Sequence, residues 1–430
     1  MATATAATLK ELSMPSPRPA DTNWDRIAPR PFKIAVPESG LDDLKARLAR
    51  VRWPDEISGE PWQFGTDLAY LKSLCAYWKD QYDWRAQEAQ INLFKQFKVS
   101  IGGCELHYIC EHGEGANPRP LLLTHGWPGS FYEYHKLIPR LTHPSRYGGS
   151  PDDAFTVVAP SMPGHGFSFR ENQARFGLNE IADNLKTLMV DVPGHRSFAA
   201  HGHDWGAFIA TRLGYAHAAH VSGIHITLLA IPRRPATTPP RTPDEERFQR
   251  QLDHWLREET GYSQIMGTKP QTLAYALTDS PAGLAAWIIE KFHRWSDCGG
   301  DLDRHFSRDV LLTNIMIYWL TGAIGSTFWP YYARLHEPWI VPDGESVMVP
   351  TAYAEHPREI LTPPRSLAEP FYGNIRRWTR MPAGGHFPAL EYPEGAGDRY
   401  PRFFSESDAL KHDPEKWNPV FRKDHAQTKS

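Results

Sequence analysis

An aspartate between two glycines is the residue whose setting in this sequence most favours covalent chemistry. Asp204 lies in the pentapeptide Gly202–Gly206 (GHDWG), after the short apolar run Ser197–Ala200 and before a helix-like stretch, Ala207–Gly214. Glycine at both ends permits a sharp strand-to-helix turn, which lifts the side chain of residue 204 out of a sheet. At a helix N-terminus, the dipole and the free N–H groups stabilise an anion. The pattern therefore predicts a nucleophilic carboxylate on Asp204, where serine is more usual.

A second loop is suited to supply the hydrogen-bond donors that such a nucleophile needs. The apolar run Leu121–Thr124 ends in the loop His125–Ser130 (HGWPGS), which glycine and proline keep tight. A loop at the C-terminal edge of a strand can direct a backbone N–H toward the nucleophile. We expect the N–H groups of Trp127 and Trp205 to form an oxyanion hole.

A histidine and a carboxylate further along the chain complete a catalytic triad. His386 follows a Gly-Gly turn just beyond a strand-like run, and nucleophile, acid and histidine occur in this chain order in α/β-hydrolases. The acid is expected after the penultimate strand, Val347–Tyr353. Glu359 fits this place best, and Glu355 and Asp343 are the competing residues.

The residue types restrict the chemistry. An aspartate nucleophile forms an alkyl ester on the protein, and it is ill-suited to ester or amide substrates because these would give an anhydride. Its targets are sp³ carbons that carry a leaving group, which means epoxides or alkyl halides. The imidazole of His386 then activates a water that hydrolyses the ester, and Glu359 orients the imidazole. This chemistry is expected to use neither a cofactor nor a metal ion.

Short apolar runs alternate with helix-like stretches in the middle of the chain, which is typical of a mainly parallel sheet. Between two groups of these runs, Pro232–Thr242 is rich in proline and arginine, and Phe248–Tyr332 is mostly helical and aromatic. Such an insertion indicates a cap over the active edge of the sheet. We therefore predict an α/β-hydrolase fold with a helical cap and an N-terminal helical extension. The expected elements are strands at Leu121–Thr124, Phe155–Ala159, Ser197–Ala200, Ile224–Ala230, Val347–Tyr353 and Ile375–Met381, and a helix at Leu178–Leu188.

The N-terminal part has a different pattern. Leu41–Asn92 has helical periodicity, and Phe97–Cys110 is expected to form two strands joined at Gly102-Gly103. The predicted division of the chain is a flexible tail at 1–30, an N-terminal extension at 31–110, the first part of the hydrolase core at 111–231, the cap at 232–345 and the second part of the core at 346–430.

The overall composition is that of a globular protein. The 430 residues are 41% hydrophobic and carry a formal net charge of −3, whereas a nucleic-acid binder would show a basic surplus. No apolar stretch has the length of a signal peptide or of a membrane span. We expect a cytoplasmic protein without a membrane span. Its oligomeric state is open, with a homodimer through the N-terminal segment as one alternative.

Several motifs together resemble the microsomal-type branch of the epoxide hydrolases, which includes the juvenile hormone enzymes. The similarity runs from about Pro31 to Phe404. In contrast to the animal microsomal members, this sequence is expected to lack a membrane-anchoring helix. The matching segments are Arg52–Asp55 (RWPD), Tyr82–Arg85 (YDWR), His125–Ser130, Ser161–Ser168 (SMPGHGFS), the Asp204 pentapeptide and Gly384–Phe387 (GGHF).

This resemblance implies two acids that the residue pattern alone does not reveal. In this family two cap tyrosines protonate the oxygen of the opening epoxide, and the matching positions are Tyr262 and Tyr331. Tyr332 is an alternative to Tyr331, since the local spacing allows a shift of one residue. His203 departs from the family, which usually has a smaller residue, commonly glycine, at this position. His203, Tyr332 and Phe328 are further candidates for lining the substrate pocket.

The predicted function is hydrolysis of a small apolar epoxide to a vicinal diol through an ester on Asp204. One alternative is a haloalkane or haloacid dehalogenase that uses the same nucleophile. The other is a catalytically inactive α/β-hydrolase that binds a hydrophobic ligand, although the complete set of Asp204, Glu359 and His386 counts against it.

Overall fold

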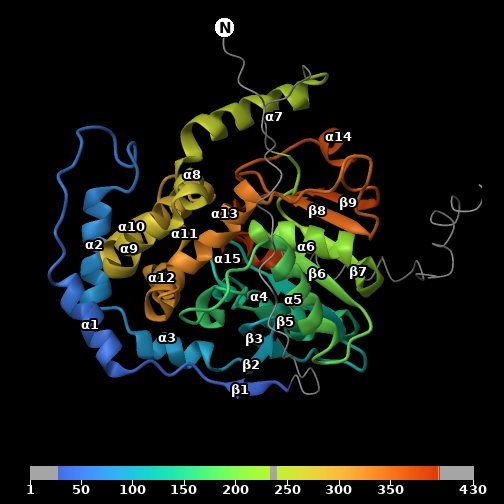
Figure 1. The fold of residues 1–430 in the computed structure, drawn as a ribbon, viewed down its shortest axis with the longest axis horizontal. Coiled ribbons are helices and arrows are strands. Elements are labelled where there is room, and N and C mark those ends of the chain that lie inside the picture. The colour runs from blue at the N-terminus through green and yellow to red at the C-terminus, as the bar shows by residue number, and fades with distance from the viewer. Residues whose placement is uncertain (1–27, 233–239, 396, 398–430) are drawn as a thin grey trace, which may run out of the picture.

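One nine-stranded sheet organises the molecule (Figure 1). The structure is a computed structural model that describes residues 28–232, 240–395 and 397, so most of the predicted N-terminal tail lies outside the described residues. The strand order is β1-β2-β3-β5-β4-β6-β7-β8-β9, and the strands from β5 through β4 to β9 are parallel. Strands β5 and β6 are buried along their whole length, as expected for parallel strands covered on both faces. The predicted α/β-hydrolase fold is confirmed.

The strand bounds agree with most of the predicted runs. The N-terminal extension supplies β1, β2 and β3, which add an antiparallel edge to the same sheet. The strands are β1 (Arg30–Phe32), β2 (Gln96–Ile101), β3 (Cys104–Glu111), β4 (Arg119–Thr124), β5 (Phe155–Pro160), β6 (Phe198–Gly202), β7 (Val221–Ile226), β8 (Thr351–Glu355) and β9 (Ile375–Arg380).

Two predicted strand bounds are wrong. The strand expected at Val347–Tyr353 begins only at Thr351, since Pro350 lacks the N–H that a strand position would donate. Val347 instead forms an isolated bridge with Tyr372. The strand expected at Ile224–Ala230 begins three residues earlier and ends at Ile226, where the chain turns toward the cap.

Helices cover both faces of the sheet and build the cap, and α6 packs directly on β4, β6 and β7. Short 3₁₀ turns lie at Phe131–Tyr134, Pro144–Tyr147, Pro151–Asp153, Gly166–Ser168, Ala218–His220 and Ala323–Phe328, and a π-helical turn lies at Trp255–Glu259. The helices are α1 (Glu38–Leu48), α2 (Leu68–Asp80), α3 (Trp84–Ile91), α4 (Leu137–Thr142), α5 (Leu178–Val190), α6 (Trp205–Ala216), α7 (Pro243–His254), α8 (Gly261–Thr268), α9 (Pro270–Asp279), α10 (Pro281–Trp295), α11 (Leu302–His305), α12 (Arg308–Thr321), α13 (Trp329–His336), α14 (Arg365–Ala368) and α15 (Pro388–Glu391).

The cap includes the largely apolar helix α12. Within the described ranges no single helix has the length and apolar character to cross a membrane. The segments Arg308–Thr321 and Ala323–His336 meet the criteria of length and composition only as a pair, which is bent by 99°. Much of α12 is buried between the N-terminal helices and the core.

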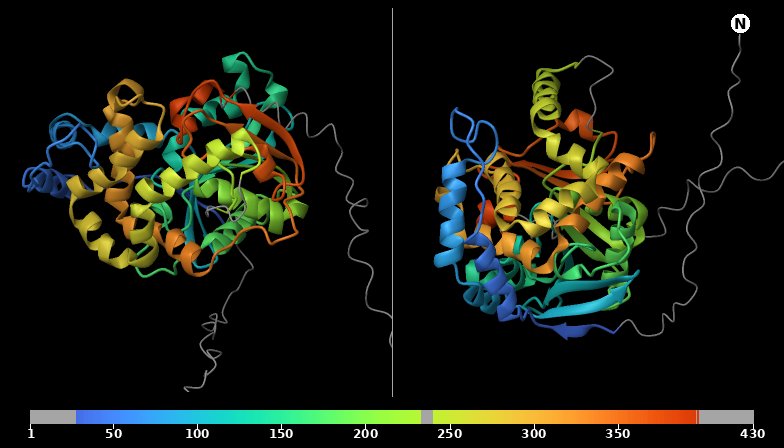
Figure 2. Two further views of the ribbon diagram at one scale, coloured as in Figure 1. Left: turned by 90° about the horizontal axis from the view of Figure 1, so that it is seen from above. Right: turned by 60° about the vertical axis from the view of Figure 1, so that its left-hand side comes forward.

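The N-terminal helices pack against the outer side of the cap. Figure 2 shows α1 and α2 along its outer flank. The hydroxyl of Tyr77 donates to Asp309 at 2.8 Å, and the hydroxyl of Tyr82 lies 3.0 Å from that of Thr313. Trp78, only 2% exposed, directs its indole N–H at the sulfur of Met316. Helix α12 is thus held between the N-terminal extension and the core.

We predict that Trp78→Ala destabilises the protein by about 3–5 kcal/mol, because it leaves a cavity between α2 and the cap. The matched control is Tyr275→Ala in cap helix α9, where the aromatic side chain is 71% exposed. This control should change stability by no more than about 0.5 kcal/mol. Thermal unfolding of the two variants measures the difference. Equal melting temperatures would contradict a stabilising role for the packing of α2 against the cap.

Candidate active site

The turn that carries Asp204 is strained and tightly packed. Asp204 has φ 48° and ψ −126°, a left-handed conformation that is costly for a residue with a side chain. The two glycines are required by space, as predicted. A Cβ on Gly202 would come within 2.1 Å of the carbonyl oxygen of Gly206, and a Cβ on Gly206 within 1.9 Å of that of Thr124. The packing forces the chain to present the Asp204 side chain at the sheet edge.

One oxygen of the Asp204 carboxylate lies in the predicted oxyanion hole. The N–H of Trp127 donates to Oδ1 at 2.8 Å, and the N–H of Trp205 also stabilises the ionised carboxylate. Two side chains of α12 hold the Trp127 loop in place. Asn314 donates to the carbonyl of Pro128 at 2.8 Å, and Tyr318 donates to that of Gly129 at 2.5 Å. The cap therefore helps to fix a donor that belongs to the core.

The other oxygen faces the predicted histidine. Nε2 of His386 lies 3.4 Å from Oδ2 of Asp204, and its Nδ1 lies 2.6 Å from Oε1 of Glu359. His386 and the Glu359 side chain are fully buried. The N–H of Ile360 donates to the same Glu359 oxygen at 2.7 Å and so helps to fix the carboxylate. The structure thus brings together the three residues predicted as a triad.

The two competing acids lie elsewhere. Glu355 accepts a hydrogen bond from the indole N–H of Trp378 at 2.9 Å and lies 3.6 Å from Arg380. Asp343 is exposed in the loop before β8.

Burial and charge act in opposite directions on the triad. Burial alone raises the pKa of Asp204, but His386 and the N–H groups of Trp127 and Trp205 outweigh it and lower the pKa to about 2. Burial likewise lowers the pKa of His386, and the carboxylates of Glu359 and Asp204 raise it above its ordinary value. The nucleophile is therefore ionised in the resting site, and it is paired with a protonated imidazole.

A carboxylate that was not predicted holds the backbone on both sides of His386. The Glu391 side chain is fully buried. It accepts hydrogen bonds from the N–H groups of Gly385 at 2.9 Å and Phe387 at 2.8 Å. It also accepts one from the backbone N–H of Asp297 at 2.7 Å. The sequence shows only that a glutamate follows His386 by five residues. Its role could not be predicted, because the partners of Glu391 are main-chain groups.

Two tyrosines of the cap meet beside the oxyanion hole. The rings of Tyr262 and Tyr331 lie 5.7 Å apart, and both side chains are buried. The Tyr262 ring stacks on Trp127 at 5.4 Å, and the Tyr331 ring meets Trp205 edge-on at 4.9 Å. Burial, together with the nearby Tyr262 and Asp204, raises the pKa of Tyr331 well above 10, so that its phenol stays protonated.

The remaining predicted pocket residues have different surroundings. Tyr332 stacks on Trp329 at 4.7 Å and on His336 at 3.9 Å along the outer side of α13. Phe328 is fully buried where α13 begins. His203 lies against a buried glutamate, Glu133, at 2.6 Å.

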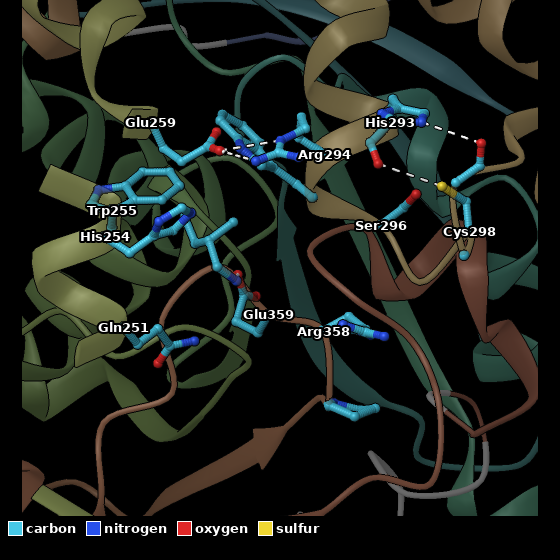
Figure 3. Close-up of a pocket in the computed structure, with 15 residues that line it drawn as sticks. Gln251, His254, Trp255, Glu259, His293, Arg294, Ser296, Cys298, Arg358 and Glu359 are labelled. Atoms are coloured by element: carbon cyan, nitrogen blue, oxygen red, sulfur yellow. Dashed lines mark hydrogen bonds and ion pairs between the residues drawn. The ribbon is translucent and has the colours of Figure 1, made fainter. Parts of the chain in front are cut away.

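A pocket of about 560 Å³ adjoins the triad on the Glu359 side. Figure 3 shows Gln251, His254, Trp255 and Glu259 along one side, and His293, Ser296 and Cys298 along the other. Its inner wall includes Trp255 and Trp295, whose rings are 5.9 Å apart. Trp295 lies 5.0 Å from the His386 ring and 5.2 Å from the Tyr262 ring. Two indoles therefore separate this pocket from the reacting groups.

Comparison with known proteins gives the same identification in sequence and in structure. The family model "Epoxide hydrolase N terminus" matches residues 29–134, and the model "alpha/beta hydrolase fold" matches residues 119–265. A putative epoxide hydrolase of Stigmatella aurantiaca is 40% identical over 84% of this chain and 82% of its own length. Epoxide hydrolase 1 of Oryctolagus cuniculus is 36% identical over 88% of this chain and 89% of its own.

A solved structure extends the similarity to the arrangement of the whole chain. The juvenile hormone epoxide hydrolase of the silkworm Bombyx mori superposes on this chain with a TM-score of 0.79 at 28% identity. The superposition covers 90% of this chain and 96% of the silkworm chain. Each of these proteins is matched over most of its length. The chain therefore belongs to the epoxide hydrolase family, in the branch of epoxide hydrolase 1 and the juvenile hormone epoxide hydrolases.

Proposed function

We propose that the protein hydrolyses small apolar epoxides to vicinal diols through an ester on Asp204. The observation that carries this proposal is the arrangement around one buried carboxylate. One oxygen of Asp204 accepts N–H hydrogen bonds, the other faces His386, and two buried tyrosines lie beside the same oxyanion hole.

In the first step, Oδ2 of Asp204 attacks a ring carbon of the epoxide and forms the ester bond. The carbon–oxygen bond of the ring breaks, and its electron pair goes to the ring oxygen. Tyr262 or Tyr331 gives this oxygen a proton, because a phenol is a far stronger acid than the alcohol being formed. Esterification removes the charge of Asp204 and lowers the pKa of His386, so that the imidazole can return a proton to the phenolate.

In the second step, the neutral His386 accepts a proton from water, whose oxygen attacks the ester carbonyl carbon. The negative charge develops on Oδ1, which lies in the hole formed by the N–H groups of Trp127 and Trp205. Collapse of this intermediate breaks the bond between the carboxyl carbon and Oδ2. The proton that remains on the added hydroxyl passes to the leaving oxygen, and the diol is released. The carboxylate of Asp204 and the protonated imidazole are restored, so that all protons balance over the cycle.

We expect Asp204→Ala to reduce diol formation from styrene oxide by a factor of about 10⁴ or more, because it removes the nucleophile. His386→Gln should keep the first step and block the second. Intact mass spectrometry should then show the protein heavier by one substrate molecule, and the mass increase should disappear in the double variant with Asp204→Ala. An unmodified His386→Gln protein that still forms diol slowly would contradict the covalent route.

The same assay tests whether the protein is instead a dehalogenase, which would also form an ester on Asp204. Incubation with a chloroalkane should release no halide, because the cap presents a pair of phenols beside the nucleophile. Halide release without diol formation would instead identify a dehalogenase.

The two neighbouring tyrosines of α13 provide a matched pair of variants. Tyr331→Phe should slow ester formation by about 10²-fold or more, because it removes one of the two acids. Tyr332→Phe should change the rate by less than about twofold, since its ring stacks on Trp329 and His336 away from Tyr262. Single-turnover kinetics would measure both rates, and equal effects would contradict the assignment of Tyr331.

We further propose that the substrate approaches through the 560 Å³ pocket and passes Trp255. Trp255→Ala should therefore raise kcat/KM for a wide epoxide, trans-stilbene oxide, relative to styrene oxide. The control is Trp339→Ala, because Trp339 packs on Tyr215 and Arg212 of α6. If both variants change the ratio of the two kcat/KM values equally, or neither changes it, the route past Trp255 is wrong.

A further inference from the structure

We infer that the buried pair of Glu133 and His203 positions the two halves of the oxyanion hole relative to each other, and that it thereby controls hydrolysis of the ester rather than its formation. This inference rests on the proposed function, because it concerns the second half of that reaction. Neither residue takes part in the triad or in proton donation to the epoxide.

The pair is in close contact and is excluded from water. Nε2 of His203 lies 2.6 Å from Oε2 of Glu133, and their side chains are 1% and 0% exposed. The His203 ring also packs edge-on against Tyr134 at 6.2 Å and against His386 at 6.1 Å. A carboxylate and an imidazole in such a place are costly to desolvate unless each has a partner.

The pair links the two segments that carry the oxyanion donors. Glu133 belongs to the 3₁₀ turn Phe131–Tyr134, which directly follows the loop that carries the N–H of Trp127. His203 precedes Asp204 and is two residues from Trp205, which supplies the other N–H. The contact therefore joins the two segments by their side chains.

The backbone around the pair has no room for displacement. A Cβ on Gly129 would lie 1.2 Å from Oε1 of Glu133, so the carboxylate presses directly against the Trp127 loop. A Cβ on Gly126 would lie 2.3 Å from Cβ of Asp204, so this loop also touches the nucleophile. A change in the distance between Glu133 and His203 is thus transmitted to the main chain on both sides.

Each side chain depends on the other for its polar contact. In the part of the chain that the structure describes, neither the carboxylate oxygens of Glu133 nor the ring nitrogens of His203 form a hydrogen bond, so that their polar contact is the 2.6 Å approach of Nε2 to Oε2. The bonds from Asn314 and Tyr318 fix the Trp127 loop to the cap, not to the nucleophile turn. The Glu133–His203 contact therefore connects the Trp127 loop to the nucleophile turn, which those bonds do not do.

The two steps of the reaction use the hole differently. In ester formation, the Asp204 carboxylate loses charge, and the developing charge lies on the epoxide oxygen near the tyrosines. In ester hydrolysis, a full negative charge forms on Oδ1 inside the hole, where donor positions matter most. A displaced donor should therefore slow hydrolysis much more than ester formation.

The test compares single and double variants of the full-length protein with styrene oxide. His203→Ala removes the link, and Glu133→Gln with His203→Gln replaces it by a neutral pair of amides that can hydrogen-bond across the same gap. The measurements are steady-state kcat and KM, the fraction of esterified protein at steady state by rapid quench and mass spectrometry, and the melting temperature.

For His203→Ala we expect the hydrolysis rate constant to fall about 10- to 100-fold. Because kcat/KM contains only the steps up to ester formation, it should stay within about threefold of the wild type, so that kcat and KM fall together and ester accumulates. The double amide variant should recover hydrolysis to within about threefold. This recovery would show that the positions of the two side chains matter and that their charges do not. If His203→Ala folds poorly, the double amide variant still tests the inference.

The matched control is His107→Gln. His107 is equally buried, and its ring nitrogens contact Gln96 and Ser161 rather than the oxyanion loop or the nucleophile turn. It should lower the melting temperature without ester accumulation.

A parallel fall of kcat and kcat/KM in His203→Ala, without accumulated ester, would overturn the inference. So would a double amide variant as slow as His203→Ala, which would show that charge and not position is needed. If the His386→Gln trap described above shows no ester at all, both the inference and the proposed covalent route fail. If that trap works, only the role of the Glu133–His203 pair is at issue.

Discussion

The constraint on which the site depends is the burial of an ionised carboxylate. Removing such a group from water costs several kcal/mol even after the surroundings relax, so the Asp204 anion persists only because fixed partners replace its water. These partners are the N–H groups of Trp127 and Trp205 and the imidazole of His386, and together they hold the pKa of Asp204 at about 2. The strained turn, the glycines without space for a Cβ and the hydrogen bonds from α12 all serve to keep these partners in place.

The same ion pair allows one histidine to serve in both halves of the reaction. While Asp204 is charged, it raises the pKa of His386 together with Glu359, and the imidazole holds a proton. Esterification removes one of these two charges, so that the imidazole loses its proton when a base is required. Glu359 remains charged throughout and limits how far the pKa falls. No movement of the histidine is needed for this change, since the reaction itself alters the electrostatic field.

The sequence was sufficient for those features that depend on local geometry. The glycines around Asp204, the apolar strands and the order of the triad each follow from short-range rules, and the structure has them where they were expected apart from the bounds of β7 and β8. Tyr331 and Tyr332 could not be separated by spacing alone. Adjacent residues of a helix point about 100° apart, so only the packing of α13 decides which ring meets Tyr262. Glu133 was missed because its partner, His203, is distant in sequence. Glu391 was missed because its partners are main-chain N–H groups, which no residue pattern specifies.

The cap is connected to the catalytic machinery more directly than a simple cover would be. Helix α12 receives a hydrogen bond from Tyr77 of α2 on its outer side, and on its inner side Asn314 and Tyr318 donate to the carbonyls of the Trp127 loop. A rigid movement of the whole cap away from the core would leave the carbonyls of Pro128 and Gly129 without these donors and would loosen the oxyanion hole. Each such buried group costs about 1–3 kcal/mol when it loses its partner. Movement of a side chain in the wall, such as Trp255 in its π-helical turn, breaks none of these bonds. The hydrogen-bonding pattern therefore favours substrate entry through a local change in the pocket wall over opening of the cap.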